Sequence, residues 1–240
     1  MNVFAPTQKL IRVLDDLLVR GNVSGGQITF TPEGAFFTNS YFSSSICHGR
    51  LLPEYFIEYS VTRPETIRFT STMLANLKAI KDPNATILTS QENVMFKGET
   101  QDSYSEPMTS LHEELPIDFV EHGQGRLPVS EEDPVLPIAE LRIKRSALST
   151  LPSAEEYYMT LQNDRLSIEI RGLGNFTRNV EVNEFIVNEN VTVLLDNENF
   201  KYAFNGPSDD CVVFLNPDLV IGNYATVGYS LNLAAATRRI

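Results

Sequence analysis

The chain has 240 residues, 42% hydrophobic and 21% charged, a composition that excludes a disordered or fibrous protein and allows one large domain or two ordinary ones. No run of about 18 apolar residues or secretory signal is present, so an intracellular protein that spans no membrane is expected. The formal net charge of −12 argues against a uniformly basic nucleic-acid-binding surface, so the distribution of the charges matters more than their sum.

The first predicted element is an amphipathic helix over residues 7–20, TQKLIRVLDDLLVR. Apolar residues recur every three or four positions along it, which is the spacing of one helix face. Lys9, Arg12, Asp16 and Arg20 lie on the other face. A polar helix face is usually only solvated, so this one gains meaning only if other helices repeat it.

Short strands and a second helix fill the rest of the first half. The Pro-Glu-Gly sequence at 32–34 predicts a hairpin turn. A helix is expected over 70–81, with Lys78 and Lys81 exposed together, and Pro83 ends it because proline cannot continue the hydrogen-bond ladder. Strands are expected at 27–31, 35–39, 45–51, 55–61, 66–69, 85–90 and 94–98.

Residues 111–137 have the composition of a connector between two domains, 1–110 and 138–240. From residue 110 to 137 the chain holds four prolines, two glycines and seven acidic residues. The segment also carries apolar residues, among them Leu127 and Val129, which a solvated linker would not need. Part of the connector is therefore expected to lie on a protein surface.

The second half repeats the order of elements of the first. A strand end and helix are expected over 141–151 and a short helix over 196–204, and Lys144 follows Arg12 at a distance of 132 residues. Strands are expected at 157–162, 165–171, 176–182, 191–195, 211–215, 219–221 and 229–233. A few helices among many short strands predict an α+β protein made of two similar domains, each with two helices packed on antiparallel sheets.

Charge is distributed unevenly between these elements. The helix segments 7–20, 70–81, 141–151 and 199–204 contain nine of the 19 Lys and Arg but two of the 31 Asp and Glu, a net charge of +7 against −19 for the rest. Their basic residues are Lys9, Arg12, Arg20, Lys78, Lys81, Arg142, Lys144, Arg145 and Lys201. Short helices often expose Lys and Arg, but Glu forms helices as well and is missing from these segments. The pattern predicts a positive strip that attracts a polyanion.

These stretches together resemble the DNA sliding clamps of the PCNA and T-even phage type. KLIRVLDDL resembles the first clamp helix, and GQITFTPEGAFFTNSYFSSSI the hairpin and strand that follow it. EYFIEYSV, TIRFTSTMLANLKAI and ATILTSQENVMFKGE follow the family's order of strand, helix and hairpin, and YSLNLAAATRRI resembles its last strand and tail. The chain departs from the family in its longer, more acidic connector and in lacking an alanine-proline pair near its end.

The resemblance implies a trimeric ring of six domains in which helices line a hole around duplex DNA. Binding is expected to be independent of sequence, because phosphate contacts carry no base information. The expected partners are double-stranded DNA, DNA polymerase, a clamp loader, other replication and repair proteins that bring short peptides, and further copies of the chain; no cofactor is expected. The residues expected to face DNA are Lys9, Arg12, Arg20, Lys78, Lys81, Lys144, Arg145 and Lys201.

The resemblance also implies a peptide pocket and a subunit interface. The pocket candidates are Tyr41, Leu127, Val129 and Pro217, although ordinary packing explains each of them equally well. Subunits of the family join through edge strands. The matching strands lie around residues 95–104 and 177–182, and the interface candidates are Lys97, Thr177, Arg178 and Val180, with Arg178 a candidate to pair with an acid across the interface.

Other functions fit the sequence less well. His112, Glu113, Glu114 and His122 match no established metal-site spacing, and no phosphate loop, nucleophile elbow or cysteine cluster is present, so neither catalysis nor a metal is expected. Cys47 and Cys211 are expected to be buried free thiols. The alternatives are a β-rich viral coat or adhesion protein, which would leave the basic helices unexplained, and a subunit of a heteromeric clamp.

Overall fold

The computed structural model describes residues 1–18, 25–41, 45–90, 93–100, 103–107, 119–122, 125–130, 133–134, 136–163, 165–171, 174–187 and 189–238. The chain divides into two compact units. Unit 1 comprises Met1–Tyr41, Cys47–Leu115 and Val227–Tyr229, and unit 2 comprises Phe42–Ile46, Pro116–Thr226 and Ser230–Ile240. None of the described helices is long and apolar enough to cross a membrane.

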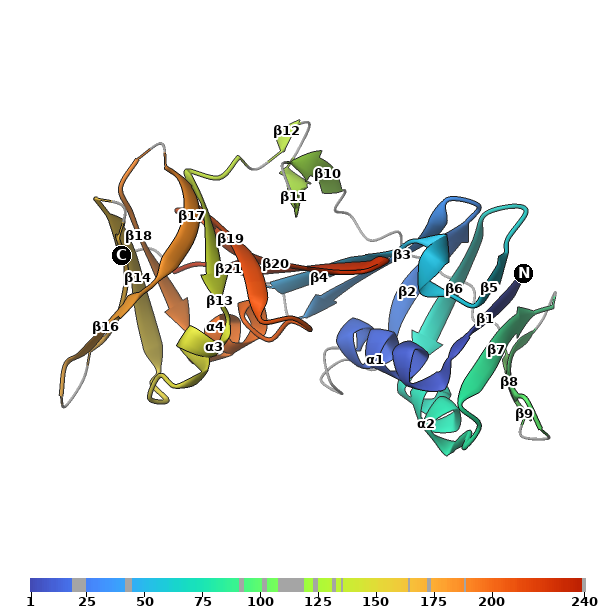
Figure 1. Cartoon of the computed structure of the whole chain (residues 1–240). Coiled ribbons are helices and arrows are strands. Elements are labelled where there is room, and N and C mark those ends of the chain that lie inside the picture. Colours follow the sequence, from blue (N-terminus) through green and yellow to red (C-terminus); the bar gives the residue numbers. More distant parts are fainter. Residues whose placement is uncertain are drawn as a thin grey trace. The chain divides into compact units, whose positions relative to one another are not determined.

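Unit 1 contains two antiparallel sheets and, among its described residues, two α-helices (Figure 1). Its elements are β1 (Asn2–Pro6), α1 (Thr7–Leu17), β2 (Gly25–Thr31), β3 (Gly34–Tyr41), β4 (Ser45–Leu51, whose first two residues belong to unit 2), a 3₁₀ turn (Pro53–Tyr55), β5 (Glu58–Ser60), β6 (Glu65–Thr70), α2 (Ser71–Ala79), β7 (Asn84–Thr89), β8 (Asn93–Gly98) and β9 (Ser103–Pro107). The strand orders are β5-β1-β7-β8-β9 and β4-β3-β2-β6. The helices α1 and α2 lie next to each other.

Local sequence explains the helices and the first hairpin of unit 1. Apolar residues of α1 at helical spacing are buried, as the amphipathic pattern predicts. The Thr70 hydroxyl caps α2 by accepting a hydrogen bond from the Met73 amide at 3.2 Å. Gly34 closes the β2–β3 hairpin with a φ of +137°, where a side chain would collide with the Leu51 carbonyl. The rings of Phe69 in β6 and Phe96 in β8 are buried and pack against each other with centroids 6.0 Å apart.

Unit 2 repeats this plan. Its elements are β10 (Phe119–His122), β11 (Gly125–Ser130), β12 (Asp133–Pro134), β13 (Ala139–Lys144), α3 (Ser146–Ser149), β14 (Glu156–Gln162), β15 (Arg165–Ile170), β16 (Phe176–Val180), β17 (Val182–Val187), β18 (Val191–Asp196), α4 (Asn197–Ala203), β19 (Asp210–Asn216), β20 (Leu219–Thr226) and β21 (Tyr229–Ala236, whose first residue belongs to unit 1). The strand orders are β16-β15-β14-β18, β17-β13-β19-β20-β21 and β10-β11-β12. The ring of Phe200 in α4 stacks on Tyr157 of β14 at 4.1 Å.

The α+β architecture with two helices in each described unit confirms the predicted fold class. The predicted strand over 55–61 is too long: a 3₁₀ turn that begins at Pro53 buries Tyr55, and only β5 is a strand. The helix predicted within 141–151 shortens to one turn, since α3 buries a single side chain, Leu148. Three short strands of a small sheet, β10 to β12, lie where the sequence predicted a connector.

Candidate nucleic-acid interface

In unit 1 four basic side chains lie at α1 and α2. Lys9 and Arg12 are exposed on α1, Lys78 is exposed on α2, and Lys81 is exposed two residues beyond the end of α2. The Lys9 ammonium lies 4.7 Å from the centroid of the Tyr55 ring and 3.4 Å from its carbonyl oxygen. This places two positive side chains on one helix and two at the other helix, all open to solvent.

Helix α1 is fastened to unit 1 by two tyrosine hydroxyls. The Tyr55 hydroxyl donates to the Lys9 carbonyl at 3.1 Å, and burial raises the pKa of Tyr55 to about 12. The Tyr229 hydroxyl donates to the Asp16 carboxylate at 2.7 Å, and burial raises the pKa of Tyr229 well above its usual value. Tyr229 lies 213 residues beyond Asp16, so the position of α1 depends on the first residue of β21, far along the chain.

In unit 2 the basic residues at 144 and 145 lie where β13 leads into α3. Lys144 faces Asp210 in the β13–β19 register, with its ammonium 2.6 Å from the carboxylate, and this hydrogen bond raises the pKa of Lys144. The Asp209 carboxylate caps α3 by accepting from the Ser146 amide at 2.7 Å, which lowers the pKa of Asp209. Arg145 is the residue between these two contacts and is half-buried.

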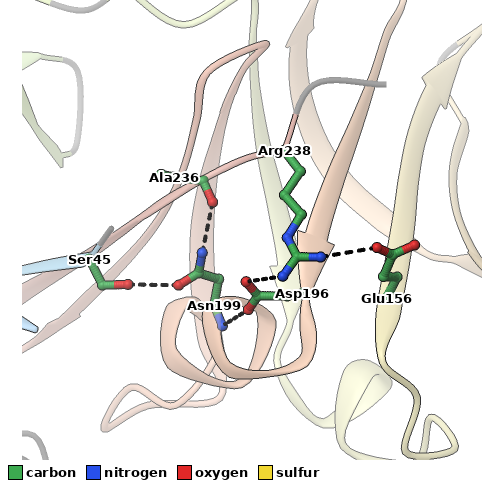
Figure 2. A network of polar contacts seen from close by, with 6 residues as sticks. All are labelled: Ser45, Glu156, Asp196, Asn199, Ala236 and Arg238. Carbon is green, nitrogen blue, oxygen red and sulfur yellow. Dashed lines mark hydrogen bonds and ion pairs between the residues drawn. The ribbon is translucent and has the colours of Figure 1, made fainter. Parts of the chain in front are cut away.

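Helix α4 carries the exposed Lys201 and is positioned by buried polar groups. Figure 2 shows the Asn199 side chain accepting from the Ser45 hydroxyl at 2.9 Å and donating to the Ala236 carbonyl at 2.9 Å. The backbone N–H of Asn199 donates to the Asp196 carboxylate at 2.8 Å, and this hydrogen bond caps the N-terminus of α4. One side chain thereby joins the start of β4, the start of α4 and the end of β21.

The end of the described chain is held next to this network. The Arg238 guanidinium lies 3.1 Å from the Glu156 carboxylate and 3.4 Å from that of Asp196 (Figure 2). The Arg238 amide also donates to the Leu194 carbonyl at 2.8 Å. Asp196 therefore serves two groups, the helix cap and the guanidinium of Arg238.

Two open hollows lie on the described surface. One of about 560 Å³ is lined by Ser153, Ala154, Glu155, Asp196, Asn197, Glu198 and Arg238. The other, of about 400 Å³, is lined by Gln8, Ile11, Arg12, Asp15 and Asp16. Among the described residues, no three His, Cys, Asp or Glu side chains are arranged to hold a metal ion.

The boundaries of the helices correct the charge argument made from sequence. The helices themselves carry Lys9, Arg12, Lys78 and Lys201 against Asp15, Asp16 and Glu198. Arg142 and Lys144 belong to β13, Arg145 precedes α3, and Lys81 follows α2. The prediction that the helices themselves are strongly positive is therefore wrong. The basic residues lie partly on the helices and partly on the strand ends and turns beside them. Arg20 lies outside the described residues.

The structure contains acidic partners that the sequence analysis missed. Asp15 lies 2.9 Å from the Lys78 ammonium, and Asp210 pairs with Lys144. Asp15 and Lys78 are 63 residues apart, and Asp210 and Lys144 are 66 apart. Only the packing of α1 on α2 and the register of β13 with β19 bring each pair together, so no local pattern could have identified them.

The candidates for a peptide pocket stay predictions. Tyr41 ends β3, and Leu127 and Val129 lie in β11, but the side chains of all three are outside the described part. Pro217 is exposed in the β19–β20 turn, where its carbonyl accepts a hydrogen bond from the Thr237 hydroxyl.

The interface candidates lie on or beside strands at the ends of their sheets. In the described residues, β9 is the last strand of one sheet of unit 1 and β16 the last strand of one sheet of unit 2. Lys97 is exposed on β8, one strand in from β9. On β16, Thr177 is exposed and Val180 is buried. Arg178 donates to the Ala147 carbonyl and the Thr150 hydroxyl, so its guanidinium already has contacts in its own chain at α3.

Comparison with known proteins shows the fold. No protein-family model matches the chain, and no curated protein matches it in sequence. A structure of A. fulgidus PCNA bound to the C-terminal region of FEN-1 matches with a TM-score of 0.79 and 14% identity, covering 100% of this chain and 98% of the other. The PCNA2–PCNA3 complex of Sulfolobus tokodaii and the PCNA of Thermococcus kodakaraensis match with TM-scores of 0.76 and 0.77 and 12% identity, each over 99% of both chains. The chain has the PCNA-type clamp fold over its whole length.

Proposed function

We propose that this chain is a subunit of a sliding clamp, a ring that encircles duplex DNA and tethers DNA polymerase and other replication or repair proteins. The observation that carries the proposal is the agreement with PCNA structures over essentially the whole of both chains. The exposed basic residues beside the helices of both units add a physical reason for a polyanionic partner. The protein is proposed to act without catalysis and without a cofactor.

Contact with DNA is proposed to be electrostatic and independent of sequence. Lysine and arginine side chains on helix surfaces reach phosphates, and such contacts give no base readout. The residues proposed to face DNA are Lys9, Arg12, Lys78, Lys81, Lys144, Arg145 and Lys201, together with Arg20. The whole chain has a formal net charge of −12, so its surface away from these residues is acidic and disfavours DNA.

Ring closure is proposed to pair β9 of one copy with β16 of the next. Each is an end strand within the described residues, and antiparallel pairing would satisfy the outward backbone groups of both. The interface would join two different surfaces, so it gives a closed ring when the rotation per subunit closes after three copies. A homotrimer is proposed; a heteromeric ring is the alternative, since one structural neighbour is a complex of PCNA2 with PCNA3.

Partner proteins are proposed to bring short apolar peptides to Tyr41, Leu127, Val129 and Pro217, and a clamp loader to open the ring. One structural neighbour is PCNA bound to the C-terminal region of FEN-1. Replacing Tyr41 and Leu127 with Ala should weaken binding of such a peptide in a fluorescence titration while the oligomer stays intact. Unaltered binding would remove these two residues from the pocket.

The DNA face is tested by charge reversal. Replacing Lys9, Arg12, Lys78 and Lys144 with Glu should abolish stimulation of the cognate polymerase on a primed template, while sedimentation still gives the mass of a trimer. Reversal of two exposed cations of strand and loop regions, Arg63→Glu and Arg165→Glu, is the matched control and should leave stimulation intact. Full stimulation by the quadruple variant would refute the proposed face.

A further inference from the structure

Two of the lysines proposed to contact DNA already have a carboxylate beside them. The Lys78 ammonium lies 2.9 Å from Asp15, with side chains 49% and 34% exposed. The Lys144 ammonium lies 2.6 Å from Asp210, with side chains 50% and 66% exposed. Three of the four side chains are exposed and Asp15 is half-buried, so a phosphate approaching from outside can reach each pair.

The two pairs arise from different packing, one in each unit. Asp15 projects from α1 toward α2, whereas Asp210 begins β19 opposite the last residue of β13. By contrast, Lys81 and Lys201 form no ion pair with any described residue. The candidate DNA face thus contains lysines that are paired with a carboxylate and lysines that are not, and substitutions of the carboxylates can separate the two kinds.

We propose that Asp15 and Asp210 set the affinity of the DNA face, each competing with DNA phosphates for its lysine. The inference rests on the proposed function and adds its regulation. An exposed ion pair contributes little to stability, so a phosphate can replace the carboxylate at small cost. The carboxylate nevertheless opposes binding, because it repels the incoming phosphate and neutralises the lysine before contact. The pairs therefore keep DNA contacts weak and short-lived, as a protein that moves along DNA requires.

The size of the effect follows from simple electrostatics. One unit charge at about 7 Å in water changes the binding constant about threefold. A lysine already neutralised by a carboxylate displaces fewer counterions from DNA than an unpaired lysine. Removing the carboxylate should therefore steepen the slope of log affinity against log salt by up to about 0.9 for each pair that contacts the duplex.

The test uses the full-length oligomer and a fluorescent 30-base-pair duplex titrated at several KCl concentrations. Asp15→Asn and Asp210→Asn should each raise affinity about threefold at fixed salt and steepen the salt slope, and the double variant should add the two effects. Glu198→Gln removes an exposed acid from α4 and is the matched control, expected to leave the salt slope unchanged. Adding Lys78→Gln to Asp15→Asn should cancel the gain.

Wild-type affinity and slope in both Asn variants, or weaker binding, would overturn the inference; so would a slope change in Glu198→Gln as large as in Asp15→Asn. Thermal unfolding of each variant checks that the fold is retained. Retention of the wild-type protein on circular DNA distinguishes a failure of this inference from a failure of the proposed function. If the wild type is retained and the Asn variants bind like it, this inference alone fails; if the wild type is not retained, the proposed function fails.

Discussion

Replacing Asn199 with Ala should destabilise unit 2 at three separate elements at once. Asn199 is 7% exposed and its partner Ser45 is 2% exposed. The substitution therefore removes one hydrogen bond from the buried Ser45 hydroxyl and one from the carbonyl of the half-buried Ala236. Each buried polar group left unpaired costs about 1–3 kcal/mol. Alanine recovers roughly 0.5 kcal/mol through its higher helix propensity. For the two groups together, the expected loss in the free energy of unfolding is therefore about 1.5–5.5 kcal/mol.

The chain has no tryptophan, so circular dichroism in urea is the suitable equilibrium measurement. Hydrogen exchange then locates the effect. Amides at the start of β4, in α4 and at the end of β21 should all exchange faster in Asn199→Ala, because the carboxamide joins these three segments. The Asn199→Asp variant keeps the acceptor for Ser45 but loses the donor to Ala236.

Ser45→Ala is the matched partner substitution, and the double variant should lose less than the sum of the two single ones, since both remove the same hydrogen bond. A change below about 0.5 kcal/mol for Asn199→Ala, within the range of ordinary surface substitutions, would refute the reasoning. Faster exchange confined to α4 would also contradict it.

Three further outcomes are expected. Tyr229→Phe should lower the free energy of unfolding by about 1.5–3 kcal/mol, the value of a hydrogen bond to a charged group such as Asp16. Tyr158→Phe is the control and should change it little, because the Tyr158 hydroxyl lies 3.4 Å from Glu156. Equal losses for the two variants in urea titrations would argue against the contact between Tyr229 and Asp16. Burial raises the pKa of Tyr55 to about 12, whereas a tyrosine in the unfolded chain ionises near pH 10, so the free energy of unfolding should hold below pH 10 and fall between pH 10 and 12. The fall should be smaller in Tyr55→Phe. If the free energy of unfolding depends on pH in the same way in both proteins, Tyr55 is not the cause. The hydrogen bond from the Ser146 backbone amide lowers the pKa of Asp209, so the contact at the start of α3 should hold above the usual carboxyl pKa and weaken as the pH falls through the lowered pKa. Asp209→Ala should speed hydrogen exchange of the Ser146 backbone amide at neutral pH. An unchanged exchange rate would argue against this contact.

The spacing of apolar residues and the residue types at turns made much of the fold predictable. The spacing of apolar residues identified α1 and α2, and the Pro-Glu-Gly turn identified the β2–β3 hairpin. The first strand β1 was missed and the edge strand β9 was not recognised as a separate strand, because each has only five residues. In β1 the consecutive apolar residues Val3, Phe4 and Ala5 were a weak signal in the sequence.

The candidate site was less predictable than the fold, because its electrostatics depend on contacts between distant segments. Lys78 and Lys144 look like available cations in the sequence, yet each has a carboxylate more than 60 residues away in the chain. Arg178 is a candidate for a contact across a subunit interface, which stays a prediction; its contact with α3 of its own chain was not visible in the sequence. Residue type predicted the sign of the charges; only the helix packing and the strand register show which of them are paired.

The central claim is that the assembled protein encircles DNA. The most direct measurement loads the protein with its clamp loader onto a nicked circular duplex, isolates the complex in high salt and then cuts the circle once. A ring that holds DNA by topology should stay bound to the closed circle and be released on linearisation. Equal retention on circular and linear DNA, or loss from both in high salt, would contradict the account.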